Sequence, residues 1–119
     1  MNTIQIIAFT HKQFNFDEIG LFHLDDNQRI GFLTNLKTKL DMEELMYLST
    51  CNRVEFIISR EKKINKSFVE KLIKHLLADQ IPTNLKDIVD RAEIMDNKAA
   101  VHHIFSVASS IDSLVVGER

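Results

Sequence analysis

The only cysteine of the sequence, Cys51, has the residue type and the surroundings of a reactive thiol. Its neighbours Thr50, Asn52 and Arg53 are polar, whereas a cysteine that only fills a core usually has apolar neighbours. A guanidinium favours the thiolate, which is the nucleophilic form, and can hold a carboxylate through two hydrogen bonds. The segment indicates either a nucleophile beside a carboxylate-binding arginine, or a structural thiol beside a solvated surface arginine.

A second candidate for chemistry is His103, which lies among the apolar residues of a predicted helix. It is either a hydrogen-bonded core residue or a group that transfers protons at a site. The serine-rich segment 109–113 follows, and it either lines a pocket or ends that helix. The basic segment 60–66 either contacts phosphates or forms a solvated surface.

The spacing of histidine and glycine excludes several kinds of site. The five histidines are scattered, and neither an HExxH motif nor Cys/His spacing indicates a metal site. The three glycines, Gly20, Gly31 and Gly117, form neither a GxGxxG motif nor a P-loop. We therefore expect this chain to bind no metal, and to bind no dinucleotide in the usual way.

The composition is typical of one globular domain. The sequence has 119 residues, of which 45% are hydrophobic and 27% are charged, so one core is expected. A net charge of −2 argues against a dedicated basic nucleic-acid module, although a local basic patch remains compatible with it. One cysteine cannot form an intrachain disulfide, which predicts a reducing, cytoplasmic location. The amino terminus has no basic leader, and no stretch approaches the roughly 18 apolar residues of a membrane span.

Four segments have the composition of β-strands. The apolar run near the start, Ile4 to Thr10, predicts a largely buried first strand. Two β-prone segments, Glu44–Ser49 and Val54–Ser59, flank the polar tetrapeptide and place Cys51 at a junction between strands. The segment Ile88–Met95 predicts a fourth strand.

The segments between these strands have the periodicity of helices. A short helix is predicted near residues 17–22, and a longer one runs from a capping box of Asp25 and Gln28 to Leu40, with Ile30 in its apolar stripe. The strongest periodicity follows Ser67, which with Glu70 fits another capping box.

A last helix is predicted over residues 99–108, with Ala100, His103, Ile104 and Val107 on one stripe. The order strand, helix, strand, strand, helix, strand, helix predicts an α+β sandwich of ferredoxin-like type. We expect one mostly antiparallel sheet covered by helices.

Two stretches resemble the catalytic N-terminal domain of glutamyl-tRNA reductases. Residues 48–57, LSTCNRVEFI, have the family's form LSTCNRxE, and residues 103–118, HIFSVASSIDSLVVGE, are similar to its HLFRVASGLDSxVLGEPQ. The start IIAFTHK is similar to the family's GLNHKTAP segment, with His11 and Lys12 in the matching places. The resemblance implies that residues 1–119 are this substrate-binding domain.

The resemblance implies a reaction in which NADPH reduces the glutamate of glutamyl-tRNA to glutamate-1-semialdehyde, the first step of five-carbon tetrapyrrole synthesis. Cys51 falls on the family's nucleophile, which attacks the ester carbonyl, expels tRNA and leaves a glutamyl thioester. Thr50 and Arg53 match positions that hold the glutamate, and Ser113 matches a pocket serine. His103 matches an active-site histidine that either orients the substrate or helps proton transfer to the leaving ribose hydroxyl.

The resemblance also implies that the family has further domains, which we do not expect in this chain. The family's NADPH-binding domain and helical dimerisation domain are expected to be absent, so this chain should not complete the reduction by itself. The whole protein is expected to be a homodimer, and the single domain could be a monomer. The chain departs from the family at Ser110, where the family has glycine, and at Arg119, where it has proline.

Two other functions remain open at this point. One is a non-catalytic module of the same fold that presents a tRNA-binding surface through Lys62 and Lys63. The other is a redox sensor in which Cys51 oxidises reversibly and, without a second cysteine, pairs between chains.

Overall fold

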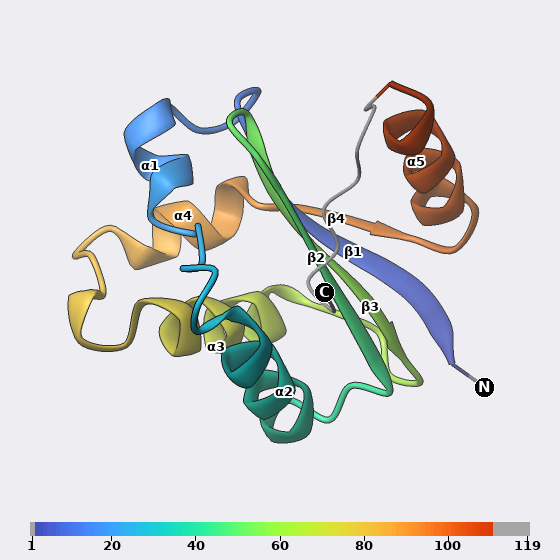
Figure 1. The fold of residues 1–119 in the computed structure, drawn as a ribbon, viewed down its shortest axis with the longest axis horizontal. Coiled ribbons are helices and arrows are strands. Elements are labelled where there is room, and N and C mark those ends of the chain that lie inside the picture. Colours follow the sequence, from blue (N-terminus) through green and yellow to red (C-terminus); the bar gives the residue numbers. More distant parts are fainter. Residues whose placement is uncertain (1, 111–119) are drawn as a thin grey trace.

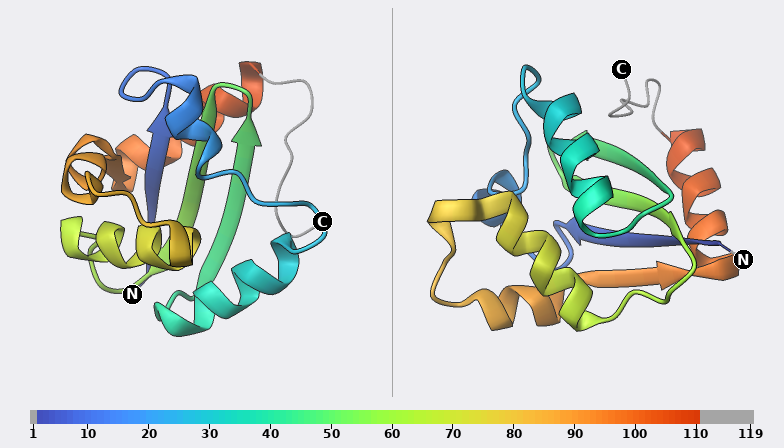
Figure 2. Two further views of the ribbon diagram at one scale, coloured as in Figure 1. Left: turned by 90° about the vertical axis from the view of Figure 1, so that its left-hand side faces the viewer. Right: turned by 90° about the horizontal axis from the view of Figure 1, so that it is seen from below.

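A four-stranded antiparallel sheet runs through the middle of the molecule, which is a computed structural model that describes residues 2–110. The strands lie in the order β2-β3-β1-β4. Helices α1 to α4 lie on one side of the sheet, and helix α5 lies on the other (Figures 1 and 2). The strands are β1 (Thr3–Thr10), β2 (Glu44–Thr50), β3 (Arg53–Arg60) and β4 (Glu93–Asp96). The helices are α1 (Phe16–Gly20), α2 (Arg29–Lys39), α3 (Lys66–Leu77), the 3₁₀ helix η1 (Ala78–Gln80), α4 (Leu85–Arg91) and α5 (Asn97–Ser110).

The strand order confirms the predicted α+β fold. Strand β3 lies between β1 and β2, and β1 lies between β3 and β4, with every neighbouring pair antiparallel. This interleaving of two strand–helix–strand units is the arrangement that ferredoxin-like sandwiches share. Among residues 2–110, no helix is long and apolar enough to cross a membrane.

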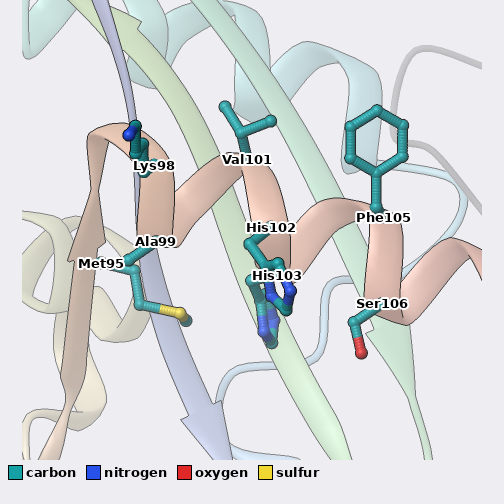
Figure 3. Close-up of a pocket in the computed structure, with 8 residues that line it drawn as sticks. All are labelled: Met95, Lys98, Ala99, Val101, His102, His103, Phe105 and Ser106. Carbon is teal, nitrogen blue, oxygen red and sulfur yellow. The ribbon is translucent and has the colours of Figure 1, made fainter.

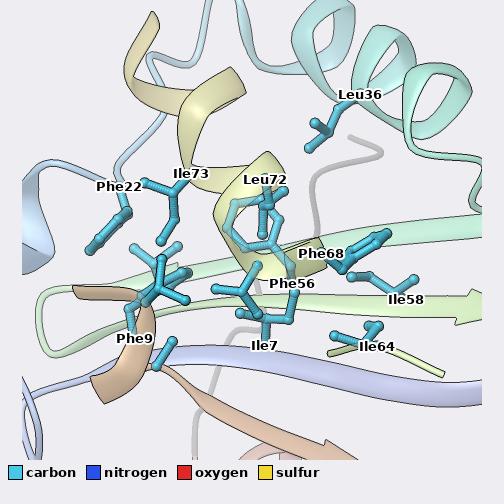
Figure 4. Packing of buried hydrophobic residues seen from close by; sticks show 14 of the residues in the cluster. Ile7, Phe9, Phe22, Leu36, Phe56, Ile58, Ile64, Phe68, Leu72 and Ile73 are labelled. Carbon is cyan, nitrogen blue, oxygen red and sulfur yellow. The ribbon is translucent and has the colours of Figure 1, made fainter. Parts of the chain in front are cut away.

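Both faces of the sheet are buried, which explains the continuous apolar runs of its central strands. On β1, Ile7 and Phe9 point into the main core beneath α1 to α4 (Figure 4). Phe9 stacks there on Phe22, with ring centroids 4.0 Å apart. The alternate residues Ile6 and Ala8 pack against Ala100 of α5 on the other face. Helix α5 therefore rests on a smaller apolar cluster than the other helices do.

The prediction of a fourth strand from Ile88 to Met95 is wrong in its first half, where the chain forms helix α4. The residues Ile88, Val89 and Ala92 are spaced to share one helical face, and all three are buried against the main core. Arg91 and Asp87, one turn apart, form an ion pair of 2.8 Å. Only Glu93–Asp96 pairs with β1 as a strand.

Both predicted capping boxes are wrong, although the helices that they mark are present. Helix α2 begins at Arg29 without a side-chain cap, and the Asp25 side chain instead accepts a hydrogen bond from the backbone N–H of Asn27. Helix α3 begins at Lys66, where the Asn65 side chain accepts a 2.9 Å hydrogen bond from the backbone N–H of Phe68. An extended asparagine in front of the helix supplies the same cap that a serine would.

The other helix predictions are confirmed with small changes. Helix α1 lies within one or two residues of its predicted place, and its capping box is formed by Asn15 and Glu18. Ala100 and Val107 are buried on the predicted stripe of α5. Ile30, which the periodicity of α2 placed on the apolar stripe, is instead 52% exposed.

The loop between β1 and α1 is held in place by Arg91. Its guanidinium donates to a Glu18 carboxylate oxygen at 2.7 Å and to the carbonyl oxygen of Gln13 at 2.9 Å. It also lies over the Phe14 ring, 4.5 Å from the centroid. The hydrogen bond from Arg91 is the main reason that the pKa of Glu18 falls from 4.5 to about 2. A charged network thus fixes the start of α1 to the end of α4.

We expect Glu18→Gln to lower the free energy of unfolding at pH 7 by about 1 kcal/mol, since solvent partly screens this surface pair. The folded-state pKa lies below the unfolded one, so this stabilisation is fully present above pH 4.5 and is lost as the pH falls toward 2. Urea denaturation between pH 7 and pH 2 should show the free energy of unfolding of the wild type falling toward that of the variant. Glu43→Gln, which changes an exposed carboxylate, is the control. A constant difference across that range would contradict the assignment.

Candidate functional site

Cys51 lies at the tip of the hairpin that joins β2 to β3. Thr50 and Arg53 are the last paired residues of the two strands, so Cys51 and Asn52 form a two-residue turn. The Thr50 hydroxyl accepts a hydrogen bond from the Asn52 N–H at 3.2 Å. The Asn52 carbonyl accepts one from the His11 N–H at 3.0 Å, which joins this turn to the loop after β1. The turn therefore holds an exposed thiol at a defined position.

A hollow of about 420 Å³ opens beside this thiol. It brings together four of the five site residues predicted from the sequence: Thr50 of β2, Cys51 of the turn, Arg53 of β3 and His103 of α5. Its lining consists of Lys12, Thr50, Cys51, Asn52, Arg53, His103, Ser106 and Val107. The fifth predicted residue, Ser113, lies outside the described residues. The hollow has the size that proteins use for small ligands.

A buried carboxylate, Glu55, connects the charged residues of the hollow. Its side chain is only 1% exposed, and it accepts a hydrogen bond from Arg53 Nη1 at 2.9 Å. His103 Nε2 lies 2.9 Å from both of its carboxylate oxygens. Burying a carboxylate costs free energy unless such partners compensate it. Glu55 therefore fixes the positions of both side chains, one on β3 and one on α5.

These contacts bear on the alternatives that the sequence left open for Arg53 and His103. Arg53 is not a solvated surface arginine, because it is 22% exposed and paired with Glu55. His103 is hydrogen-bonded, as a packed histidine would be, but it also remains 22% exposed and lines the hollow. Its position is thus compatible with contact to a ligand.

Strand alternation explains why Glu55 and Arg53 act together. Residues two apart in a strand point to the same face, and the contact of Glu55 with His103 shows that this face lies toward α5. Glu55 stands opposite Ala8 and Leu48, in the middle of the sheet. Sequence reasoning missed this residue. A charged residue inside the apolar run of β3, two positions after an arginine, is the signal that could have revealed it.

Helix α5 lines two hollows, of which one is the hollow beside Cys51. A second hollow of about 830 Å³ runs along this helix and shares His103 and Ser106 with the first. Figure 3 shows His103 and Ser106 on one side of the helix, with Val101 and Phe105 on the other. Phe105 is 72% exposed. The second hollow is therefore lined by both polar and apolar side chains of α5.

The basic segment 60–66 does not belong to this site. It begins at the far end of β3, roughly 23 Å from Arg53 at about 3.3 Å per strand residue. Lys66 donates to three carbonyl oxygens at the end of α4, and Arg60 lies 4.3 Å over the Phe68 ring. Within residues 2–110, no group of three or more His, Cys, Asp or Glu side chains could hold a metal ion.

We expect Glu55→Gln to lower the free energy of unfolding by about 2 kcal/mol, because the amide cannot compensate Arg53 and His103 as a carboxylate does. Chemical denaturation should measure this loss. The control is Glu44→Gln on β2, whose carboxylate is 74% exposed and 3.7 Å from Lys37. Equal effects of the two substitutions would show that the buried carboxylate has no special role.

Comparisons with known proteins agree on one family. The model described as "Glutamyl-tRNAGlu reductase, N-terminal domain" matches residues 7–119. The glutamyl-tRNA reductase of a Nitratiruptor species is 39% identical over 116 residues, which cover 95% of this chain and 26% of that protein. That of Campylobacter jejuni (strain RM1221) is 40% identical over 114 residues, covering 94% and 25%.

A solved structure supports the fold. Glutamyl-tRNA reductase from Methanopyrus kandleri matches with a TM-score of 0.57 and 22% identity, over 92% of this chain and 23% of that chain. The chain thus spans about a quarter of the length of the relatives that it matches. With its fold, its hairpin cysteine and these matches, the chain belongs to the glutamyl-tRNA reductase N-terminal domain family.

Proposed function

We propose that Cys51 takes the glutamyl group from glutamyl-tRNA as a thioester, in the first half of the glutamyl-tRNA reductase reaction. The observation that carries this proposal is the exposed thiol of Cys51 in a tight turn, at a hollow that Arg53 also lines. The guanidinium of Arg53 is bound to the buried carboxylate of Glu55. The names of the relatives supply the substrate, glutamyl-tRNA.

The proposed step is an acyl transfer without oxidation or reduction. The Cys51 sulfur attacks the ester carbonyl carbon, so that a C–S bond forms and the C–O bond to the ribose breaks. The thiol proton ends on the ribose hydroxyl that leaves with tRNA. His103 lines the hollow and can carry this proton, because an imidazole both accepts and donates protons near neutral pH.

Arg53 gives the hollow its preference for glutamate. The bond from Nη1 to Glu55 uses one of the five N–H donors of a guanidinium, and the same side chain lines the hollow. A planar guanidinium suits the γ-carboxylate of a glutamyl group, and the Thr50 hydroxyl suits its amino or carbonyl group. Glu55 keeps the guanidinium in place between encounters with substrate, which reduces the entropy lost on binding.

Reduction of the thioester to glutamate-1-semialdehyde, for tetrapyrrole synthesis, belongs to the proposal for the whole protein. We expect NADPH to supply the hydride. We expect residues outside this chain to bind it, because the three scattered glycines of this chain form no dinucleotide-binding loop. The chemistry assigned to this chain therefore ends at the thioester. A homodimeric, cytoplasmic enzyme is the corresponding expectation for the whole protein.

We expect the wild-type chain, mixed with glutamyl-tRNA and quenched in acid, to gain the mass of one glutamyl residue on Cys51. Intact-protein mass spectrometry measures this gain, and Cys51→Ser should not show it. Arg53→Ala should slow the capture by roughly tenfold or more, as expected for loss of a charged hydrogen bond. The matched control substrate is the same tRNA esterified with glutamine, because its acyl group replaces the γ-carboxylate by an uncharged amide.

An unmodified mass beside intact ester would contradict the proposal and would favour a module that binds tRNA without chemistry. Ester loss that depends on Cys51 would instead mean that hydrolysis follows capture. Reversible oxidation of Cys51 by peroxide, with no acyl transfer, would favour a redox sensor.

A further inference from the structure

A separate hollow of about 280 Å³ lies on the other side of the Cys51 turn, and the proposed function assigns it no role. It is lined by His11, Phe14, Asn15, Phe16 and Asn52. We propose that this hollow binds the terminal adenosine of the tRNA, while the hollow beside Cys51 receives the glutamyl group. This inference rests on the proposed function and adds a binding site for the leaving nucleoside.

The position of this hollow matches the geometry of the ester. Asn52 lines both hollows, and His11 and Lys12, which are adjacent in the loop after β1, line one hollow each. The His11 N–H to Asn52 carbonyl bond joins the loop and the turn into one ridge between them. In an aminoacyl ester, a single oxygen separates the acyl carbon from the ribose. A nucleoside whose ester reaches Cys51 must therefore lie directly beside this ridge.

The side chains of the hollow have the chemistry that binds a nucleoside. Phe16 is 69% exposed at the first residue of α1, and its ring is available as a stacking surface. Phe14 is buried and forms an apolar inner wall. Asn52 and the exposed His11 add polar groups that can hydrogen-bond to a ribose or a base edge. Aromatic stacking combined with a few polar groups is how proteins hold single-stranded RNA bases.

Several contacts hold the loop between β1 and α1 that forms this hollow. Arg91 lies over the Phe14 ring and binds the Gln13 carbonyl and the Glu18 carboxylate. The Asn15 side chain, in turn, accepts from the Glu18 N–H at 2.8 Å. A preformed wall of this kind loses little conformational entropy when a base stacks on it.

The test compares two small substrates of Cys51. One is 3′-O-glutamyl adenosine, and the other is the glycerol ester of glutamate, which keeps a neighbouring hydroxyl but has no base. The rate of Cys51 acylation by each ester is measured by quenched reaction and intact mass. We expect Phe16→Ala to slow acylation by the adenosine ester by about tenfold, and to leave the glycerol ester unchanged.

Two variants control for other effects of the substitution. Phe16→Trp keeps an aromatic face and should retain the wild-type ratio of the two rates. Ile30→Ala removes another exposed apolar side chain, on α2, and should change neither rate. If Phe16→Ala and the wild type give the same ratio, the adenosine site is overturned while the proposed function stands. If neither ester acylates Cys51 while glutamyl-tRNA does, the adenosine site is overturned and the proposed function stands; if glutamyl-tRNA also fails to acylate Cys51, the proposed function fails and this inference fails with it.

Discussion

The buried carboxylate of Glu55 is the constraint on which the site depends. It lies in the middle of the sheet, where a negative charge is stable only with donors on either side. Arg53 comes from the same strand, but His103 comes from α5, which otherwise rests on the small cluster of Ile6, Ala8 and Ala100. The same contacts that satisfy this charge also bring helix, strand and turn together around Cys51.

The hairpin turn divides the surface around the thiol into two regions with different chemistry. On one side, Arg53 and His103 surround a polar hollow suited to a charged amino acid. On the other side, Phe14 and Phe16 form an aromatic hollow suited to a nucleoside. Because Asn52 lines both hollows, the proposed substrate would cross the turn at the position of the thiol.

The sequence predicts the features of this fold that depend on neighbouring residues. Apolar runs correctly identify β1, β2 and β3, and the polar tetrapeptide correctly places Cys51 at a strand junction. The second half of α4, residues 88–91, was mistaken for a strand, because a short buried helix containing Ile88 and Val89 has the same local composition as a strand. The charge of Glu55 inside an apolar run is a local signal, but its contact with His103, 48 residues away, is one that no local pattern reports.

The most direct test of the central claim is the rate at which affinity labels alkylate Cys51. The claim is that Arg53, held by Glu55, makes the thiol's hollow selective for a carboxylate. A glutamyl chloromethyl ketone should label Cys51 roughly tenfold faster than its glutaminyl counterpart, and Arg53→Ala should abolish this preference. Equal rates for the two labels in the wild type, or a preference that survives Arg53→Ala, would contradict the account.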